Sequence, residues 1–212
     1  MDKAFIFDMD GVIINSEPMH EKIELSVAAE QGIELEDDNL EKYVGMRSRD
    51  MWESIIAERN FKVDVNVILN VAEQRKVQYI DTHDIEPIEG IKDLLEHLSK
   101  LRYRIALASS SSKPFIEAVL NKFEITHFFE EIVSGDDIKE GKPAPDIYLE
   151  VARRLGINPG SCLVLEDSEN GVKAGNTAGM KTIGFTNPES GNMNLSEAKN
   201  IVKSIHDVLK LI

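Results

Sequence analysis

The chain has 212 residues, of which 42% are hydrophobic and 29% charged, and its formal net charge is −14. This size allows one sizeable hydrophobic core and a small accessory domain. The negative charge argues against nucleic acid and an anionic membrane surface as partners, and no apolar segment approaches the length of a membrane span. The single cysteine excludes an intramolecular disulfide, so we expect a cytoplasmic location.

Short apolar runs predict the buried strands of a sheet. They are apolar on both faces and rich in Ile, Val and Phe, which is typical of a parallel sheet covered on each side. These runs are 4–7, 103–108, 131–135, 162–166 and 181–185. Predicted helices lie between them, at 90–101, 113–123, 145–156 and 168–179. Alternating strands and helices predict an α/β fold with a doubly wound, Rossmann-like parallel sheet.

The interval from Asn15 to Asp84 has no convincing strand, but it contains several amphipathic segments. Their apolar residues are Ile23 and Val27, then Leu40, Tyr43 and Val44, then Trp52, Ile55 and Ile56, and finally Ile68, Val71, Ala72 and Tyr79. About 70 residues of helix are too many for a simple crossover between strands. We therefore predict an α/β core formed by residues 1–14 and 85–212, and an inserted α-helical cap domain formed by residues 15–84. The cap would act as a lid.

Polar side chains lie at or beyond the carboxyl ends of the predicted strands. They are Asp8, Asp10, Ser109, Ser110, Lys142, Glu166 and Asp167. Each alone is a weak signal, because acidic turns and loop serines are common on protein surfaces. Ligands of open α/β sheets bind outside these strand ends, however, so we expect the whole set to converge on one crevice.

The paired acids Asp8 and Asp10 need a nearby positive charge, because like charges this close repel each other. Clustered carboxylates favour a hard divalent cation, and Mg²⁺ takes oxygen ligands of this kind. We predict Mg²⁺ bound by Asp8, Asp167 and the backbone carbonyl of Asp10, with Glu166 as a fourth ligand or a neighbour of the ligands.

Phosphoryl transfer through a carboxylate is the chemistry that needs such a set. Asp8 would attack phosphorus to form an aspartyl-phosphate, and Asp10 would serve as general acid and then general base. Ser109 would donate to a phosphate oxygen, and Lys142 would neutralise the transferring group.

Four segments in chain order resemble the four motifs of the haloacid dehalogenase superfamily. They are "DMDGV" (8–12), "LASSS" (107–111), "GKPAPD" (141–146) and "LEDSENG" (165–171). More narrowly, the chain resembles the β-phosphoglucomutase and sugar-phosphatase branch, whose helical cap is inserted after the first motif. The resemblance covers essentially the whole chain and implies the same roles for the strand-end residues. The acid at position 10 suits phosphoryl transfer and disfavours dehalogenation.

The cap should recognise the leaving part of the substrate through polar and cationic residues. The candidates are Ser16, His20, Arg47, Arg49 and Lys76, together with Ser110 of the core. By resemblance, His20 and Lys76 match a His and a Lys of the phosphomutases. The hinge "NSEP" and the loop "GMRSRD" depart from the mutase pattern, and we expect one of the two arginines to be merely solvated.

The sequence thus predicts a Mg²⁺-dependent phosphatase that acts on a small phosphorylated metabolite, with a sugar phosphate as the first choice. The alternative is β-phosphoglucomutase activity, which would use the same catalytic residues. A smaller alternative is a non-catalytic binding protein on the same scaffold, which should have lost Asp8 or Lys142. We expect a monomer or weak homodimer, with neither a nucleic-acid nor a membrane partner.

Overall fold

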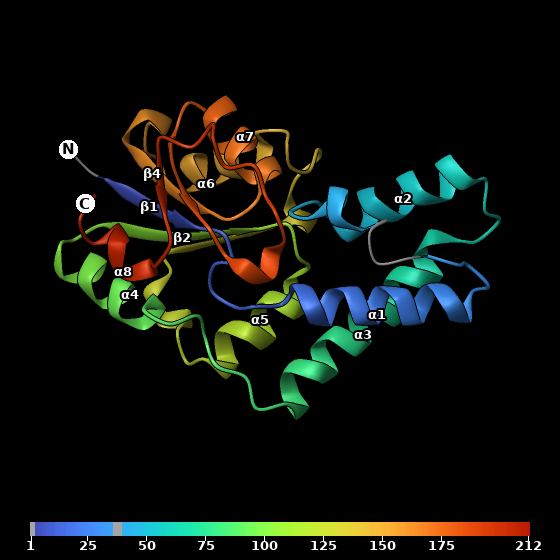
Figure 1. Cartoon of the computed structure of the whole chain (residues 1–212). Helices are drawn as coiled ribbons and strands as arrows, with labels where there is room; N and C mark the ends of the chain where they lie inside the picture. The colour runs from blue at the N-terminus through green and yellow to red at the C-terminus, as the bar shows by residue number, and fades with distance from the viewer. Residues whose placement is uncertain (1–2, 36–39) are drawn as a thin grey trace.

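The computed structural model describes residues 3–35 and 40–212 (Figure 1). Within these residues, one parallel sheet has the strand order β3–β2–β1–β4–β5–β6. The strands are β1 (Ala4–Phe7), β2 (Arg104–Ser109), β3 (Glu131–Ser134), β4 (Cys162–Glu166), β5 (Lys181–Phe185) and β6 (Asn200–Val202). The predicted doubly wound α/β fold is confirmed. The sixth strand, β6, was not predicted.

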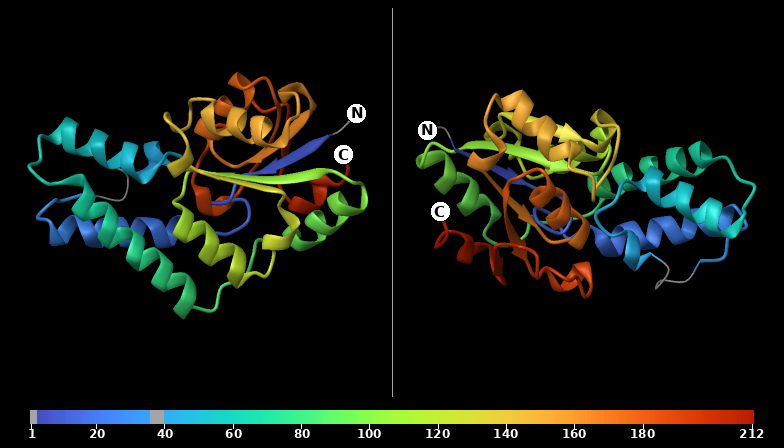
Figure 2. Two further views of the ribbon diagram at one scale, coloured as in Figure 1. Left: turned by 180° about the vertical axis from the view of Figure 1, so that it is seen from behind. Right: turned by 90° about the horizontal axis from the view of Figure 1, so that it is seen from above.

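Helices cover both faces of the sheet (Figure 2). They are α4 (Ile91–Lys100), α5 (Lys113–Lys122), α6 (Asp146–Leu155), α7 (Glu169–Thr177) and α8 (Ile205–Val208). Short 3₁₀ turns are η3 (Thr126–Phe128), η4 (Gly135–Asp137), η5 (Pro159–Ser161) and η6 (Pro188–Ser190). Successive β1 side chains point to opposite faces, so Phe5 and Phe7 join one hydrophobic cluster and Ala4 and Ile6 the other. All four are fully buried, which explains why this strand has no polar position.

The chain between β1 and α4 forms a helical group beyond the carboxyl ends of the strands (Figure 1). It contains α1 (Glu17–Glu30), the 3₁₀ turn η2 (Glu41–Tyr43), α2 (Ser48–Arg59) and α3 (Val65–Thr82). Helix α3 packs against both α1 and α2, and the fully buried Trp52 belongs to the same hydrophobic cluster as Phe5 and Phe7. The expected helix around Tyr43 was wrong, because only a three-residue 3₁₀ turn forms there. The predicted cap also includes residues 36–39, and the predicted core residues 1–2, which lie outside the described residues.

None of the helices in the described segments combines the length and the apolar character needed to cross a membrane.

Candidate active site

The site lies at the carboxyl ends of β1 and β4, which are neighbours in the sheet. Asp8 follows β1 directly, and its backbone N–H donates to the carbonyl of Leu165 at 3.0 Å. Glu166 is the last residue of β4, and Asp167 follows it. The crossovers from β1 and β4 lead to different parts of the sheet, which opens a crevice at this position. The two adjacent strands therefore bring three acidic side chains together.

Lys142 places a buried ammonium group among these acids. Its Nζ donates to Oδ1 of Asp8 at 2.6 Å and to Oε1 of Glu166 at 2.6 Å, while the carbonyl of Ala108 lies 3.4 Å away. Only 1% of Lys142 is exposed. Burial lowers the pKa of Lys142, but the two carboxylates outweigh this effect and hold the pKa above its ordinary value. The lysine therefore stays charged and offsets the repulsion between the acids.

Glu166 is held in place by hydrogen bonds to both of its oxygens. Oε1 also accepts from the Tyr148 hydroxyl at 2.7 Å. Oε2 accepts from the backbone N–H groups of Asp167 and Ser168 at 3.1 Å each, and from Oγ of Ser168 at 3.0 Å. A Cβ at Gly171 would lie 1.7 Å from Oε1, so glycine is required there. Tyr148 was missed because nothing in the sequence marks the first turn of α6 as part of the site.

The three acids fit a hard divalent cation. Ligand oxygens of Asp8, Glu166 and Asp167 all lie within 4.8 Å of one another. Oδ2 of Asp8 and Oδ1 of Asp167 accept no hydrogen bond within the described part of the chain, whereas Oδ2 of Asp167 accepts one from Ser190. Gly11 has φ +72°, and a Cβ there would lie 1.8 Å from Oδ2 of Asp167, so the backbone passes directly against this acid. This oxygen-only donor set matches the preference of Mg²⁺.

The electrostatics of Asp8 and Asp167 also favour a cation. Burial raises the pKa of Asp8; Lys142 lowers it, but Glu166 adds a further upward effect, and the pKa stays well above its usual value. Burial likewise raises the pKa of Asp167, and the charges of Glu166 and Asp8 raise it further. One lysine does not fully compensate three acids, and a divalent cation would stabilise their ionised forms.

Four side chains lie within hydrogen-bonding distance of the Asp10 carboxylate. Oδ1 accepts from Oγ of Ser16 at 2.6 Å and lies 2.9 Å from Nε2 of His20. Oδ2 accepts from Oγ of Ser111 at 2.8 Å and from Oγ of Ser109 at 3.3 Å. Burial raises the pKa of Asp10, but His20 and the hydroxyl groups lower it by more, so the pKa falls well below its usual range. The carboxylate is therefore ionised and able to accept a proton. Sequence reasoning missed Ser111.

Ser16 and His20, predicted as substrate contacts, both bind Asp10. Ser16 is buried, and the His20 ring packs against Phe115 with 5.1 Å between ring centroids. Nδ1 of His20 is buried and has no hydrogen-bond partner among the described residues. His20 also lines the cavity described below, whereas Ser16 does not.

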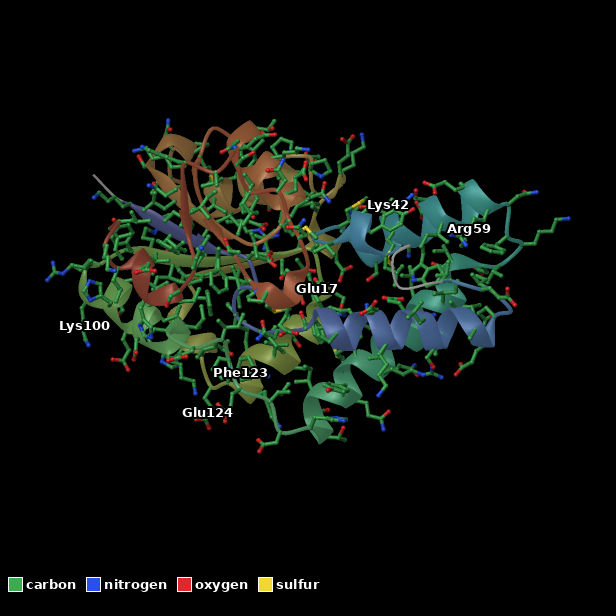
Figure 3. All side chains as sticks on the ribbon, viewed as in Figure 1. Glu17, Lys42, Arg59, Lys100, Phe123 and Glu124 are labelled. Atoms are coloured by element: carbon green, nitrogen blue, oxygen red, sulfur yellow. The ribbon has the colours of Figure 1, made fainter. Side chains whose placement is uncertain are left out.

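A cavity of about 340 Å³ lies between the helical group and the strand ends. Asp8 and Asp10 line the cavity at the strand ends, and Ser110 and Ser111 also line it. The side farthest along α1 and α3 is called the cap end here. This cap end is formed by Glu21, Glu24, Tyr43, Met46, Ser48, Met51 and Lys76, with Leu40 beside them. Glu17 lies where α1 begins, next to η6 (Figure 3).

Arg47 is not among the residues that line the cavity. Its guanidinium pairs with Asp50 through two 2.6 Å hydrogen bonds. It also donates to the backbone carbonyls of the segment that follows β3, at Gly135 (3.3 Å), Ile138 (3.1 Å) and Lys139 (3.2 Å). This arginine therefore joins the beginning of α2 to the segment that precedes Lys142.

Arg49 also lies away from the cavity, because it is exposed on α2 and donates to Asn66 at 3.1 Å. Ser110 does line the cavity, but its hydroxyl donates to the backbone carbonyl of Gly45 at 2.8 Å. Of the cationic cap residues predicted to contact substrate, the structure brings only His20 and Lys76 to the cavity, within the described part of the chain.

Comparison with known proteins gives one family and several relatives. A family model for haloacid dehalogenase-like hydrolases matches residues 5–185. The phosphorylated carbohydrates phosphatase of Thermotoga maritima is 31% identical over 182 residues, which are 85% of this chain and 83% of that protein. Hexitol phosphatase B of Escherichia coli is 32% identical over 193 residues, which are 89% and 86% of the two chains. A crystal structure of β-phosphoglucomutase from Clostridium difficile superposes with a TM-score of 0.85 at 31% identity, covering 98% of this chain and 93% of that one.

Proposed function

This chain belongs to the haloacid dehalogenase-like hydrolases, and we propose that it is a phosphatase for small phosphorylated sugars or polyols. One observation carries the proposal: Lys142 donates to Asp8 and Glu166 at the ends of two adjacent strands, beside the donor-lined carboxylate of Asp10. This arrangement suits a carboxylate nucleophile with a separate acid–base group. The sugar or polyol substrate is supported by the names of the Thermotoga maritima and Escherichia coli relatives.

Asp8 would attack phosphorus through the carboxylate oxygen that does not hold the cation. Lys142 would neutralise charge on the transferring group, and Ser109 would donate to one of its oxygens. Asp10 would take a proton from the attacking water, and it would give this proton to the leaving oxygen of the next substrate. The donors around Asp10 stabilise its carboxylate, which is the form that the proton transfer from water requires.

We propose Mg²⁺ as the cofactor, held by Asp8, Asp167 and the backbone carbonyl of Asp10, with Glu166 as a further ligand or a fixed neighbour. The ion would supply positive charge to phosphoryl oxygens. The three-carboxylate cluster supports this assignment.

We propose that residues 15–84 form a cap domain over a core of residues 1–14 and 85–212. Closure of the cap would exclude water from the reacting group. The contacts of Arg47 with the carbonyls after β3, and of Ser110 with Gly45, support this role because they join the two parts across the cavity.

We also propose a cytoplasmic monomer or weak homodimer, with neither a nucleic-acid nor a membrane partner. The net charge of −14 and the free, buried Cys162 support this setting. Burial raises the pKa of the Cys162 thiol to about 11, so it should be unreactive.

The direct test is phosphate release by the purified protein with Mg²⁺, from an aryl phosphate and a panel of sugar and polyol phosphates. Asp8→Asn should abolish release, and EDTA should stop it. Asp136→Asn, at an exposed acid just after β3, should leave the rate unchanged. Wild-type turnover by Asp8→Asn would overturn the proposed nucleophile.

β-Phosphoglucomutase activity remains the second candidate, because of the similarity to the Clostridium difficile structure. Incubation with β-glucose 1-phosphate and a trace of the 1,6-bisphosphate separates the two. A phosphatase releases free phosphate faster than glucose 6-phosphate appears, and the opposite order would favour the mutase.

A further inference from the structure

The cap end of the cavity carries more negative than positive charge. Glu21 and Glu24 line it from α1, and Glu17 and Glu189 line the cavity where α1 begins beside η6. Among the described residues that line the cavity, Lys76 is the one lysine and there is no arginine. A phosphorylated substrate thus meets Asp8 and the proposed metal site at one end of the cavity and acidic side chains at the other.

The positive charge of Lys76 is already compensated by an ion pair with Glu24. Its Nζ lies 2.5 Å from Oε1 of Glu24 and 3.1 Å from Oγ of Ser48. Oε2 of Glu24 accepts from the indole N–H of Trp52 at 2.7 Å, so both oxygens of the carboxylate are bound. The Lys76 and Glu24 side chains are only 6% and 4% exposed. The pair is therefore fixed, and a second anionic group would have to displace Glu24 to reach the lysine.

We propose that the cap end is a subsite for an uncharged, hydroxyl-bearing group, and that Glu24 excludes a second anionic group from it. The substrates are then monophosphate esters of neutral sugars or polyols, and bisphosphates and phosphorylated carboxylic acids are rejected. This inference rests on the proposed phosphatase function for the position of the phosphoryl group.

The side chains at the cap end can bind an uncharged, hydroxyl-bearing group. The carboxylate of Glu21 makes no hydrogen bond to other described side chains and can accept from substrate hydroxyl groups. Ser48 can exchange hydrogen bonds with the same hydroxyls, while Met46 and Met51 offer apolar surface to the carbon chain. An anion in the same position would lie close to the cap-end carboxylates, with no unpaired lysine or arginine among the described residues that line the cavity. Such repulsion is an effective source of specificity.

The Lys76–Glu24 pair also helps to distinguish hydrolysis from phosphomutase activity. A phosphomutase must hold a sugar bisphosphate between its two half-reactions, so it needs a free cation at the end remote from the nucleophile. The Lys76–Glu24 pair leaves none among the described lining residues, which favours hydrolysis.

Two six-carbon esters that differ at C1 test the inference: sorbitol 6-phosphate, with a neutral alcohol, and 6-phosphogluconate, with a carboxylate. We expect kcat/KM to favour the neutral ester by about 100-fold, because one unscreened like charge a few ångströms away costs that much or more. Glu24→Gln keeps the side-chain shape but frees the charge of Lys76. It should reduce the preference by about tenfold or more, through a gain on the carboxylated ester.

Glu30→Gln is the matched control, because Glu30 also pairs α1 with α3, through Arg75, but lies outside the cavity. It should leave the preference unchanged. Glu21→Gln provides a second test, since Glu21 has no side-chain partner whose loss could unfold the protein, and it should shift the preference in the same direction. A wild-type ratio near one, or a ratio unmoved by both cavity variants, would overturn the inference.

Binding of both esters to Asp8→Asn separates this inference from the proposed function. Preferential binding of the neutral ester without wild-type turnover of either would contradict the phosphatase and support the subsite. Equal binding of the two esters would overturn the subsite, whether or not the wild-type protein hydrolyses them.

Discussion

Nζ of Lys142 lies 2.6 Å from Oδ1 of Asp8, although 134 positions separate the two residues in the sequence. The parallel sheet makes this contact possible, because β1 and its neighbours all end at the same edge. The pair explains how a buried strand can end in an acidic side chain close to other acids: a lysine whose pKa is held above its ordinary value contacts both Asp8 and Glu166.

Replacement of Lys142 with Met should remove this charge and leave the acids uncompensated. We expect kcat/KM to fall by about 100-fold or more, as when a group that stabilises transition-state charge is lost. The free energy of unfolding in EDTA should fall by about 3 kcal/mol, because a buried ion pair loses one partner. Steady-state kinetics and urea unfolding measure the two effects.

Lys173→Met is the control for this change. Lys173 forms an exposed pair with Glu169 on α7, so its loss should leave the free energy of unfolding nearly unchanged. A Lys142→Met protein with wild-type kcat/KM would contradict the role assigned to this lysine.

Replacement of the two arginines of the "GMRSRD" segment, Arg47 and Arg49, should have very different effects on KM. Arg47→Ala removes the contacts between α2 and the segment after β3, so the proposed closure of the helical group becomes less favourable, and KM should rise by about tenfold. Arg49→Ala removes only exposed contacts on α2 and should change KM by less than about twofold. Steady-state kinetics on one substrate compare the variants. A larger effect from Arg49 would show that Arg49 reaches the substrate after all.

The Glu24–Lys76 pair predicts a particular pH dependence of stability. Burial raises the pKa of Glu24, but Lys76 and the Trp52 hydrogen bond lower it by more, so it lies below the ordinary value of 4.5. The stabilisation is complete above pH 4.5. It is lost as pH falls from there through the folded-state pKa, because the unfolded chain gains its proton first.

Urea unfolding of the wild type and of Glu24→Gln measures this contribution. The wild type should be more stable by about 3 kcal/mol near pH 7, and the difference should shrink as the pH falls below 4.5. Glu30→Gln, at the exposed pair, should cost less than about 1 kcal/mol. A difference that grows on acidification would contradict the assignment.

The sequence predicted the α/β fold because its strands are short apolar runs with an acid, serine or lysine beyond their ends. The carboxyl ends of parallel strands lie at the same edge of a sheet. Asp8, Glu166 and Lys142 could therefore be expected to lie close together from the sequence alone. The helical group was also predictable, since the apolar periodicity around Trp52 and Ile68 excludes strands.

Features that depend on tertiary packing could not be predicted. Strand β6 has only three residues and two exposed positions, so it produces no apolar run. Tyr148 and Ser190 contact Glu166 and Asp167 through the fold alone. The direction of Arg47 depends on carbonyl groups far away in the sequence, and loop composition does not specify them.

Acid quenching of the protein during turnover, followed by peptide mapping, tests the central claim most directly. The account predicts a phosphoryl group on the peptide that contains Asp8, at the Asp8 carboxylate, and its absence from Asp8→Asn. Phosphate release at the wild-type rate with no phosphorylated peptide, or with the phosphoryl group on another residue, would contradict it.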